Sequence, residues 1–447
     1  MSKKNPTIRE NIRLGKLVHG GQAIAEVPSG KKIFVWAGLP GELVNVQITK
    51  KKGSYLEGVV TEVLEPSDDR VEPVEPVSYL STSPWQIMSF KAENIAKQDI
   101  LVEAYEREKV TIPEWSPFVA LGKAGRPAPL GVGLSDRPTE NPPGVFHYRN
   151  KMEIGFWGDD DGLHLANYVR GTHGKQIVTS NALASEEINS VAQKIALALN
   201  EYSKKLEFRA GDLKTVVLRS SRAGEVVAAL FIKKKLDLSA FELVDGLKGL
   251  VVYYSNPKSP ASVPTKKLYS LGDIKLSDSI MGKNITYDVM SFFQVNLPVF
   301  EKALDTIKDK LLSGATVDFY SGVGTIGIPL GATVLVESEE SNITMAKLNA
   351  EGTTTKVIHA TSETALDYIE QDKILIVDPP RAGLHKKVID RIAEVKPPQI
   401  VYLSCNPSTQ ARDIRLLSEF YTVSYAQGFN FFPRTPHIES LIILTLT

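Results

Sequence analysis

Cysteine is nearly absent from this sequence, with one residue in 447. The chain therefore forms no internal disulfide bond, and it cannot build an all-cysteine zinc or iron–sulfur site by itself. Long apolar runs are also missing, since no stretch reaches the roughly 18 residues that a membrane-spanning helix requires. The segment 1–16 is polar and lacks the apolar core of a signal peptide. Together these absences predict a cytoplasmic protein with no membrane contact.

Net charge is absent as well, because 52 basic residues balance 52 acidic ones. The composition, 43% hydrophobic and 23% charged, excludes collagen-like, coiled-coil and wholly disordered chains. At roughly 150 residues per domain, the length predicts about three domains. From the changes in pattern along the chain we expect a multidomain α/β protein. Its expected parts are a small OB-like β-barrel in 1–66, a linker, helix and α+β central domain in 67–285, and a Rossmann-like, doubly wound α/β domain in 286–447.

The predicted barrel rests on short β-branched runs in residues 8–63, separated by glycine and proline turns. Residues 1–60 carry ten basic residues against four acidic ones, a net charge of +6. Three aromatic residues are interleaved with them: Phe34, Trp36 and Tyr55. Because lysines contact phosphates and rings stack on bases, the pattern fits an RNA-binding barrel, with Lys50, Lys51 and Lys52 on the backbone. An ordinary barrel with solvated lysines fits the pattern equally well.

Residues 89–110 are predicted to form an amphipathic helix, because apolar residues recur at helical spacing among charged ones. We expect the charged residues of this helix to face solvent. The apolar residues that we expect to pack are Ile95, Ile100, Leu101, Tyr105 and Val110.

A glycine-rich segment, residues 315–331, carries the sharpest local signal. An apolar strand is followed by Gly322, Gly324 and Gly327 and then by a helix. Glycines at this spacing let the backbone approach a ligand closely and present N–H groups at the helix start. Glu337 ends the next strand, where a carboxylate can accept both hydroxyls of a ribose. These features predict a nucleoside cofactor, either NAD or S-adenosylmethionine.

Further strand ends carry polar or reactive side chains. Asp378 and Arg381 follow one predicted strand, Cys405 follows the next, and Glu439 begins the last. Ligands bind at the carboxyl edge of open α/β sheets, so we expect these residues to meet there. A lone cysteine is usually inert, but this position favours a reactive thiol. Glu439 is either an exposed edge charge or a positioned base, and His437 is interpreted as structural or solvated.

Taken together, the motifs resemble the RNA uridine-5-methyltransferase family, which uses S-adenosylmethionine to make 5-methyluridine. The start of the chain resembles a TRAM domain, an RNA-binding barrel, and VFHYRNKMEI at 145–154 resembles the central motif of the family. The other matches follow in the family's order: SFFQVN at 291–296, DFYSGVGTIGIPL at 318–330, DPPRAG at 378–383, SCNPST at 404–409 and TPHIES at 435–440. Five motifs in this order indicate the family far more specifically than any one motif alone.

The resemblance implies that Cys405 is the nucleophile that bonds to uracil C6, and that Glu439 is the base that resolves the adduct. Phe292 matches an aromatic residue that relatives place near the target base. The implied cofactor-binding residues are Gln294, Tyr320, Thr325, Glu337, Thr361 and Asp378. Thr325 departs from the asparagine of many relatives. We expect an electropositive setting around Cys405, with Arg381 contributing to it and to substrate binding.

Many TRAM-bearing relatives hold a four-iron cluster, and the sequence departs from them in this respect. The cysteine positions of those relatives align with Glu75, Ser81, Pro84 and Asn181. None of these side chains can replace a thiolate. We therefore expect no iron–sulfur cluster and no other metal, with packing supporting the region instead.

The sequence thus predicts methylation of uridine C5 in RNA by a monomeric enzyme that uses S-adenosylmethionine, on 23S rRNA in preference to tRNA. An amino-group methyltransferase is an alternative, in which the loop at Asp378 would hold an exocyclic amine and Cys405 would be incidental. A noncatalytic RNA-binding factor with a relic cofactor pocket is a second alternative. A nicotinamide dehydrogenase is a third, although it leaves the cysteine motif and the basic barrel unexplained.

Overall fold

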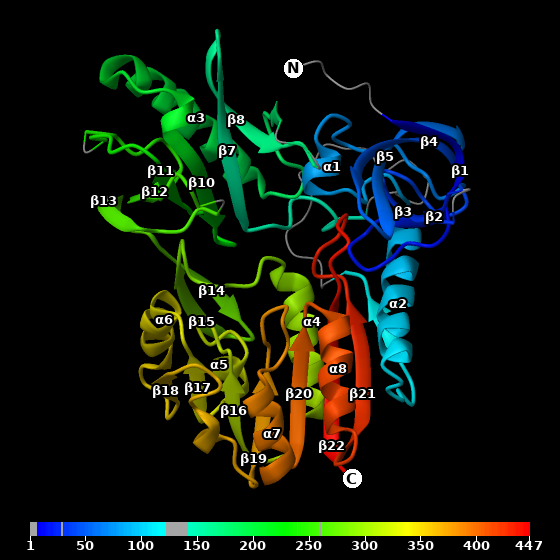
Figure 1. Ribbon diagram of the computed structural model, residues 1–447. Coiled ribbons are helices and arrows are strands. Elements are labelled where there is room, and N and C mark those ends of the chain that lie inside the picture. The colour runs from blue at the N-terminus through cyan, green and yellow to red at the C-terminus, as the bar shows by residue number, and fades with distance from the viewer. Residues whose placement is uncertain are drawn as a thin grey trace.

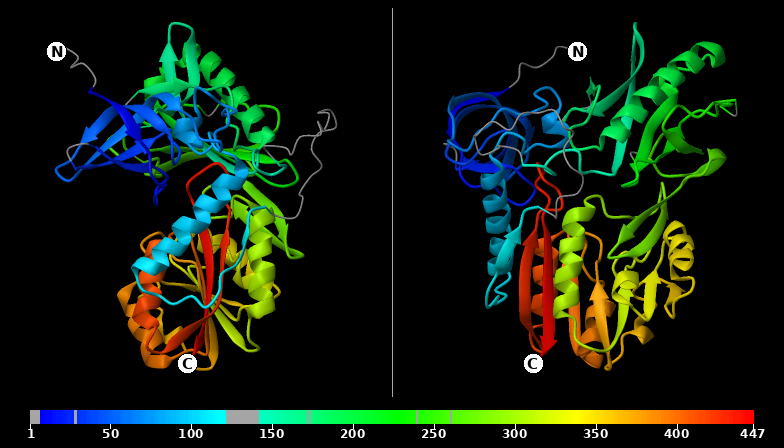
Figure 2. Two further views of the ribbon diagram at one scale, coloured as in Figure 1. Left: turned by 90° about the vertical axis from the view of Figure 1, so that its right-hand side faces the viewer. Right: turned by 180° about the vertical axis from the view of Figure 1, so that it is seen from behind.

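The computed structural model describes residues 7–447 apart from 28–29, 122–141, 171, 173, 239 and 260. In Figure 1 the N-terminal strands (blue) and the central sheet (green) lie side by side above the C-terminal sheet, which runs from yellow to red. One long helix, α2 (Phe90–Arg107), descends from the N-terminal strands along the C-terminal sheet, as both orientations in Figure 2 also show. The arrangement of sheets and helices confirms the predicted multidomain α/β class.

The N-terminal sheet has five strands in the order β1-β4-β5-β3-β2. The strands are β1 (Ile8–Arg13), β2 (Ala23–Glu26), β3 (Lys32–Trp36), β4 (Leu43–Lys51) and β5 (Tyr55–Glu65). Burial alternates along them as the pleat requires. On β3, Ile33 and Val35 are buried, whereas Phe34 and Trp36 lie on the opposite, partly exposed face. The five short strands predicted here are confirmed.

Helix α2 confirms the helix predicted over residues 89–110, and a short helix, α1 (Tyr79–Thr82), precedes it. The expectation that its charged residues face solvent is confirmed for Lys91, Asp99, Glu106 and Arg107 but is wrong for two others. Glu93 and Lys97 are fully buried, whereas Ile95 is 53% exposed. The reason is tertiary, because Glu93 and Lys97 form an ion pair at 3.0 Å on the face that meets the loop 430–434. Pairing and hydrogen bonds offset the free energy of burying these charges.

The central sheet has the strand order β13-β12-β11-β10-β7-β8-β9. Its strands are β7 (Lys151–Asp159), β8 (Gly162–Tyr168), β9 (Lys175–Ile177), β10 (Leu213–Ser220), β11 (Val226–Ile232), β12 (Leu247–Tyr254) and β13 (Lys266–Gly272). One face is covered by α3 (Glu186–Leu206), with a short 3-10 turn, η1 (Ala210–Asp212), beside it. The other face shares a core with the hairpin of β14 (Lys275–Ile280) and β15 (Lys283–Asp288) and with α4 (Leu297–Lys310).

The C-terminal sheet has the order β18-β17-β16-β19-β20-β22-β21-β6. Its strands are β6 (Ser116–Val119), β16 (Ala315–Phe319), β17 (Val334–Glu337), β18 (Lys356–His359), β19 (Lys373–Val377), β20 (Gln399–Ser404), β21 (Tyr421–Phe429) and β22 (Glu439–Leu446). Between them lie α5 (Gly327–Leu330), α6 (Glu340–Ala350), η2 (Leu366–Tyr368), α7 (Lys386–Val395) and α8 (Pro407–Leu417). Strand β6 precedes the central sheet in the chain yet pairs with β21, so the chain visits this sheet before it builds the central one.

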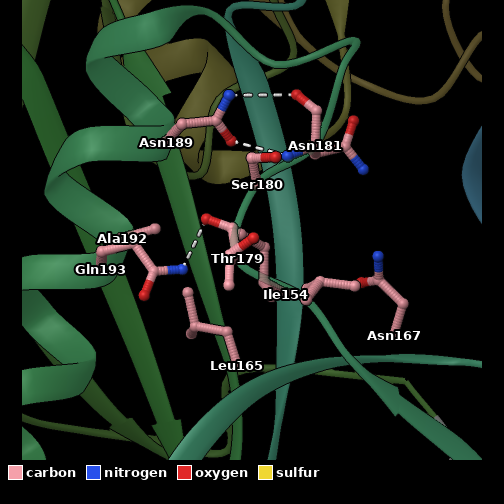
Figure 3. A pocket seen from close by; sticks show the side chains of 10 residues that line it. Ile154, Leu165, Asn167, Thr179, Ser180, Asn181, Asn189, Ala192 and Gln193 are labelled. Atoms are coloured by element: carbon pink, nitrogen blue, oxygen red, sulfur yellow. Dashed lines mark hydrogen bonds between the residues drawn. The ribbon is translucent and has the colours of Figure 1, made fainter. Parts of the chain in front are cut away.

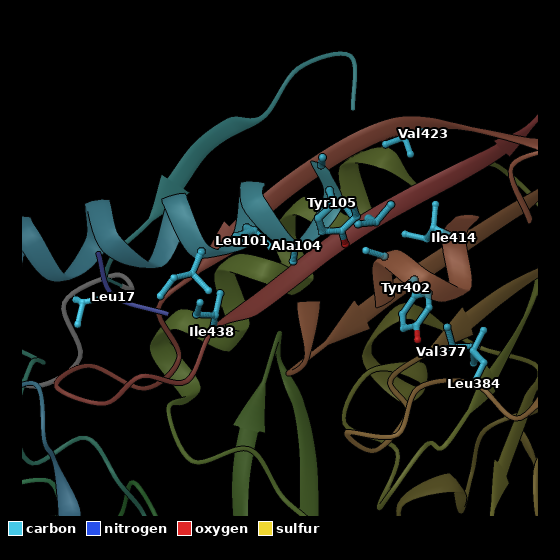
Figure 4. Packing of buried hydrophobic residues seen from close by; sticks show 14 of the residues in the cluster. Leu17, Leu101, Ala104, Tyr105, Val377, Leu384, Tyr402, Ile414, Val423 and Ile438 are labelled. Atoms are coloured by element: carbon cyan, nitrogen blue, oxygen red, sulfur yellow. The ribbon is translucent and has the colours of Figure 1, made fainter. Parts of the chain in front are cut away.

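Helix α2 joins the N-terminal strands and the C-terminal sheet into one apolar core. Figure 4 shows Leu17 of the N-terminal segment, Leu101 of α2 and Ile438 near β22 within the same cluster. Tyr105 of α2 adds a polar link, since its hydroxyl donates to Gln410 Oε1 of α8 at 2.6 Å. None of the helices in the described residues is long and apolar enough to cross a membrane.

Candidate active site

The candidate site forms where five strand ends of the C-terminal sheet meet. Strands β16, β17, β19 and β20 are parallel, so the residues after them share one edge of the sheet. Strand β22 runs antiparallel to β20 with Ser404 opposite Ser440, which brings Glu439 next to Cys405 at the same edge. Asp378 follows the neighbouring strand β19. The sequence-predicted residues Cys405, Asp378 and Glu439 are therefore brought together.

The glycine-rich loop after β16 has the backbone conformation that a close ligand approach requires. Gly322 and Gly324 have φ values of 58° and 91°, and Tyr320 has a φ of 61°, which is uncommon for a residue with a side chain. Glu337 braces this loop, because its Oε2 accepts from the Gly322 N–H at 2.9 Å while its Oε1 accepts from Ser338 N–H at 2.6 Å. The carboxylate at the β17 end is thus fixed against the loop.

Of the other predicted cofactor residues, Tyr320 and Thr325 lie within this loop. Thr325 and Gln294 are buried, at 4% and 7% exposure, and the Tyr320 hydroxyl donates to Ser362 Oγ at 2.8 Å. Thr361 follows β18 at the outer end of the row, is exposed, and hydrogen bonds to Thr364 at 3.1 Å. Phe292 is 55% exposed, and its ring lies 3.5 Å from the position of a Cβ on Gly322.

Buried carboxyl groups gather beneath the reactive edge. Burial raises the pKa of Asp378 to about 7, and burial together with Asp378 raises the pKa of Glu439 well above its ordinary value. Burial is also the main cause that raises the pKa of Asp318 well above its ordinary value. One of its oxygens accepts from the Gly327 N–H at 2.8 Å, and the other has no hydrogen-bond partner among the described residues. Such a cluster is short of positive charge and suits a cationic ligand.

The electrostatic setting of Cys405 differs from the sequence expectation. Burial, followed by the charges of Glu439 and Asp378, raises the pKa of the thiol to about 12. Arg381 acts in the expected direction, since its charge and its hydrogen bond to the thiol lower that pKa. The expected electropositive setting around Cys405 is therefore wrong, because the sheet edge places two carboxyl groups beside the sulfur.

Because Cys405 is the only cysteine, alkylation by iodoacetamide reports on this thiol alone. We expect reaction at pH 7.5 at least about 100-fold slower than with free cysteine, whose pKa is about 8.5. The rate should keep rising with pH beyond pH 9, since the thiol stays protonated below its raised pKa. Arg381→Gln should slow it further, because a charge that lowers the pKa is lost. A rate that levels off below pH 8 would contradict this picture.

Arg381 connects the loop after β19 to the last strand. Its Nη2 lies 2.9 Å from His437 Nδ1, and its backbone carbonyl accepts from Asn406 Nδ2 at 2.8 Å and from Thr409 Oγ1 at 3.1 Å. The loops that carry Arg381, Cys405 and His437 are thereby held together at the mouth of the site.

The N-terminal strands also reach the site, through the loop between β1 and β2. Gly21 packs so closely on the segment before Glu439 that a Cβ on it would lie 2.4 Å from Pro436 Cβ. The Gly21 carbonyl accepts from Trp85 Nε1 at 3.0 Å. The pKa of His19 is lowered by burial and then by the charge of Arg381. The N-terminal sheet is therefore docked on the candidate active site.

This docking is testable with two neighbouring glycines. Gly20 and Gly21 have φ values of 100° and 96°, but a Cβ on Gly20 would meet nothing within 4 Å. Both Gly→Ala changes carry the backbone strain, roughly 1–2 kcal/mol, and Gly21→Ala adds an overpacking penalty of about 1–3 kcal/mol. Scanning calorimetry should give the lower melting temperature for Gly21→Ala. Equal melting temperatures would show that the contact with Pro436 contributes nothing.

The segment 146–151 ties the central sheet to two loops of the site. Asn150 Nδ2 donates to the Gln294 carbonyl at 2.9 Å, and the Tyr148 hydroxyl donates to the Pro433 carbonyl at 3.1 Å. The Arg149 guanidinium lies over the Phe432 ring, 5.8 Å from its centroid. Sequence reasoning recognised this motif but assigned none of these contacts, because they span long stretches of chain.

The predicted RNA-contacting residues of the N-terminal sheet are exposed but not all free. Lys50 is paired with Glu57 at 2.8 Å, whereas Lys51 and Lys52 are exposed, with Lys51 Nζ donating to Thr7 Oγ1 at 3.3 Å. The Trp36 ring is covered by Arg170 of the central domain, whose guanidinium carbon lies 4.3 Å from its centroid. Trp36 therefore serves a domain contact and not an open stacking surface.

The region aligned with the iron–sulfur ligands of many relatives holds a polar network. Gln86 Nε2 donates to Ser83 Oγ at 2.6 Å and to Glu75 Oε2 at 3.4 Å. Asn181 exchanges two hydrogen bonds with Asn189, of 2.9 and 3.0 Å, beside a cavity of about 10 Å³ that has room for one water at most (Figure 3). Within the described ranges, no group of three or more His, Cys, Asp or Glu side chains could hold a metal ion.

Comparison with known proteins gives a match over most of the chain. The family described as tRNA (uracil-5-)-methyltransferase matches residues 143–447, and the TRAM domain family matches residues 10–61. A Thermotoga maritima protein described as an uncharacterized RNA methyltransferase is 28% identical over 97% of this chain and 98% of its own length. An Enterococcus faecalis protein of the same description is 29% identical over 99% and 98% of the two chains.

The fold itself has a close match among solved structures. The Pyrococcus abyssi tRNA (uracil-54, C5)-methyltransferase, solved in complex with S-adenosyl-L-homocysteine, superimposes with a TM-score of 0.73 at 21% identity. The alignment covers 97% of this chain and 99% of that one. The arrangement of all three parts of the chain is therefore shared with that enzyme.

Proposed function

Because the chain belongs to the tRNA (uracil-5-)-methyltransferase family and carries an N-terminal TRAM domain, we propose that it methylates C5 of a uridine through a covalent bond from Cys405 to C6. The family modifies RNA with S-adenosylmethionine as methyl donor. The observation that carries the covalent proposal is the meeting of Cys405, Glu439 and Asp378 at one sheet edge beside the glycine-rich loop.

The residues present fit S-adenosylmethionine. Buried Asp378 and Glu439, with raised pKa values, suit a ligand that carries positive charge. Glu337 at the β17 end supports the proposal, since a carboxylate at this position can accept the ribose hydroxyls. We propose that the cofactor is held by Gln294, Tyr320, Thr325, Glu337 and Asp378, with Thr361 at the outer end. When bound, it supplies a methyl group on a sulfonium, whose positive charge offsets the carboxylates that raise the Cys405 pKa.

Cys405 overcomes the low nucleophilicity of uracil C5. Its thiol proton leaves to solvent, and the thiolate, balanced by Arg381, adds to C6. The π electrons of C5=C6 move toward the C4 carbonyl, so C5 gains the electron density that methylation requires. After C5 has been methylated, Glu439 removes the C5 proton as general base. The electrons of that C–H bond restore C5=C6, the S–C6 bond breaks, and the thiolate is regenerated.

The target uridine must leave its stack to reach this edge. We propose that exposed Phe292 stacks on the extruded base, next to the glycine-rich loop. Arg381 lies at the mouth of the same site, where it hydrogen bonds to His437. Lys51 and Lys52, with Lys50 when it is released from Glu57, are proposed to contact phosphates further along the RNA.

The RNA class is also a proposal. We favour a uridine of 23S rRNA, because the basic barrel suits an extended RNA surface. We also propose that the protein acts as a monomer. Transfer RNA is the second candidate, since the family description and the Pyrococcus abyssi neighbour both refer to tRNA.

The test incubates the purified protein with S-adenosylmethionine and unmodified transcripts of 23S rRNA and tRNA. Nucleoside mass spectrometry should detect 5-methyluridine in one of them and locate it by fragment mapping. Methylation of an exocyclic amine that persists in Cys405→Ala would replace this proposal with the amino-group methyltransferase. No methylation and no cofactor binding by calorimetry would favour the noncatalytic factor.

A further inference from the structure

The hydrogen bond between Arg381 and His437 fixes the protonation state of the histidine. A guanidinium has only donors, so Arg381 Nη2 donates and His437 Nδ1 accepts across their 2.9 Å separation. A ring nitrogen that accepts carries no proton. His437 is therefore neutral, with its single ring proton on Nε2.

The surroundings keep this histidine neutral. Its pKa is lowered to about 3 by burial and then by the charges of Arg381, Arg149, Lys97 and Arg170. These cations come from the loop after β19, the central domain and helix α2. Each of these influences lowers the pKa of His437. His437 therefore remains a donor at Nε2 throughout the physiological pH range.

The Nε2–H group of His437 has no hydrogen bond to the described residues, although the ring is partly buried and lies against Phe432, with centroids 5.6 Å apart. Arg381 hydrogen bonds to His437, and its charge also lowers the pKa of the Cys405 thiol. His437 also lies two residues before Glu439. The uncommitted Nε2–H donor thus belongs to the ring that holds Arg381, the cation that acts on the Cys405 thiol.

We propose that His437 is a catalytic residue that donates a hydrogen bond from Nε2 to O4 of the target uracil as Cys405 adds to C6. This inference rests on the proposed function. It revises the sequence interpretation of His437 as structural or solvated.

The electron movements explain why such a donor is needed. As the S–C6 bond forms, the C5=C6 electron pair becomes the C4–C5 double bond, and the C4=O4 pair moves onto O4. The resulting enolate oxygen carries negative charge, which a placed hydrogen-bond donor stabilises in a water-poor site. No proton is transferred, since the histidine stays neutral and keeps Nε2–H. Arg381 behind Nδ1 polarises the ring and strengthens the donor, in the way that neutral histidine electrophiles act elsewhere.

Two substitutions separate this role from a structural one. His437→Asn keeps an oxygen near the Nδ1 position for Arg381 but loses the outer donor, whereas His437→Gln places an amide N–H near the Nε2 position. We expect kcat for methylation to fall by about 10²–10³-fold in His437→Asn and to be largely restored in His437→Gln. The substrates are the unmodified 23S rRNA and tRNA transcripts, with S-adenosylmethionine saturating.

A second readout isolates the addition step. Transcripts carrying tritium at uridine C5 should lose it slowly to water without cofactor, because the small thiolate fraction of Cys405 adds reversibly to C6 and makes C5 exchangeable. His437→Asn should slow this loss as much as it slows methylation. Calorimetric affinity for S-adenosylmethionine should not change. Unchanged exchange in His437→Asn, or equal losses in both variants together with lowered melting temperatures, would overturn the inference. Absence of methylation by the wild-type protein would instead refute the proposed function.

Discussion

Glu439→Gln protein incubated with S-adenosylmethionine and substrate RNA is expected to accumulate a covalent complex that survives denaturing electrophoresis. An amide cannot remove the C5 proton, so the S–C6 bond cannot break after methylation. Product turnover should fall by about 10²–10⁴-fold, the usual contribution of a general base. The isosteric change preserves the volume at a position that is only 6% exposed. Sequencing the attached RNA would also name the substrate.

The matched control is the double variant Cys405→Ala, Glu439→Gln, which should form no complex because the nucleophile is absent. Cys405→Ala alone should abolish methylation and also leave no complex. A complex that persists without Cys405 would assign the bond to another residue. Rapid turnover by Glu439→Gln with no complex would mean that another group removes the C5 proton.

Glu93→Ala is expected to destabilise the protein by about 3–5 kcal/mol, the largest stability effect that we foresee. The Glu93 carboxylate accepts from Lys97 Nζ, from Asn430 Nδ2 at 2.9 Å and from the Arg434 backbone N–H at 3.0 Å. Lys97 and Arg434 are 0% and 1% exposed, so removal of the carboxylate leaves buried positive charge uncompensated. Scanning calorimetry should show that Glu93→Ala unfolds at a lower temperature than the wild type.

Glu103→Gln on the same helix is the matched control. Glu103 pairs with Lys16 at 2.6 Å, but both side chains reach solvent, at 24% and 60% exposure. Exposed pairs contribute about 0–1 kcal/mol, so this variant should melt close to the wild type. Similar losses in both variants would show that burial of the Glu93 pair adds nothing. The Trp85 ring centroid lies 5.7 Å from Lys97 Nζ. Tryptophan fluorescence should therefore also report the lower unfolding temperature of Glu93→Ala.

The reactive edge of the C-terminal sheet was open to prediction because it depends on local sequence. A parallel strand ends where its apolar run ends, and all such ends share one edge, so the positions of Glu337, Asp378 and Cys405 follow from the pattern alone. The glycine loop was equally legible, since Gly322 and Gly324 have the positive φ values that their spacing indicates. The five N-terminal strands followed from their turns.

The electrostatic state of the site was not open to prediction, because it depends on which groups become neighbours in space. The Cys405 pKa is raised by burial and by two carboxyl groups that come from other strands, although the adjacent motifs suggested an electropositive setting. The charged residues of helix α2 were misjudged for the same reason. Glu93 is solvated in any isolated helix, and only the loop 430–434, more than 330 residues away in the chain, makes its burial favourable.

By itself, the sequence determined the order of the parts, the chemistry at each strand end and the absence of a cysteine set for a metal cluster. These properties depend on residue type, periodicity and spacing, which act over a few residues. Only the tertiary structure decided that the Gly21 loop docks on Pro436 and that Arg381 fixes the proton of His437. Contacts of this kind join segments that are far apart in the chain, and their free energy depends on burial and on neighbouring charge, neither of which is encoded in a local pattern.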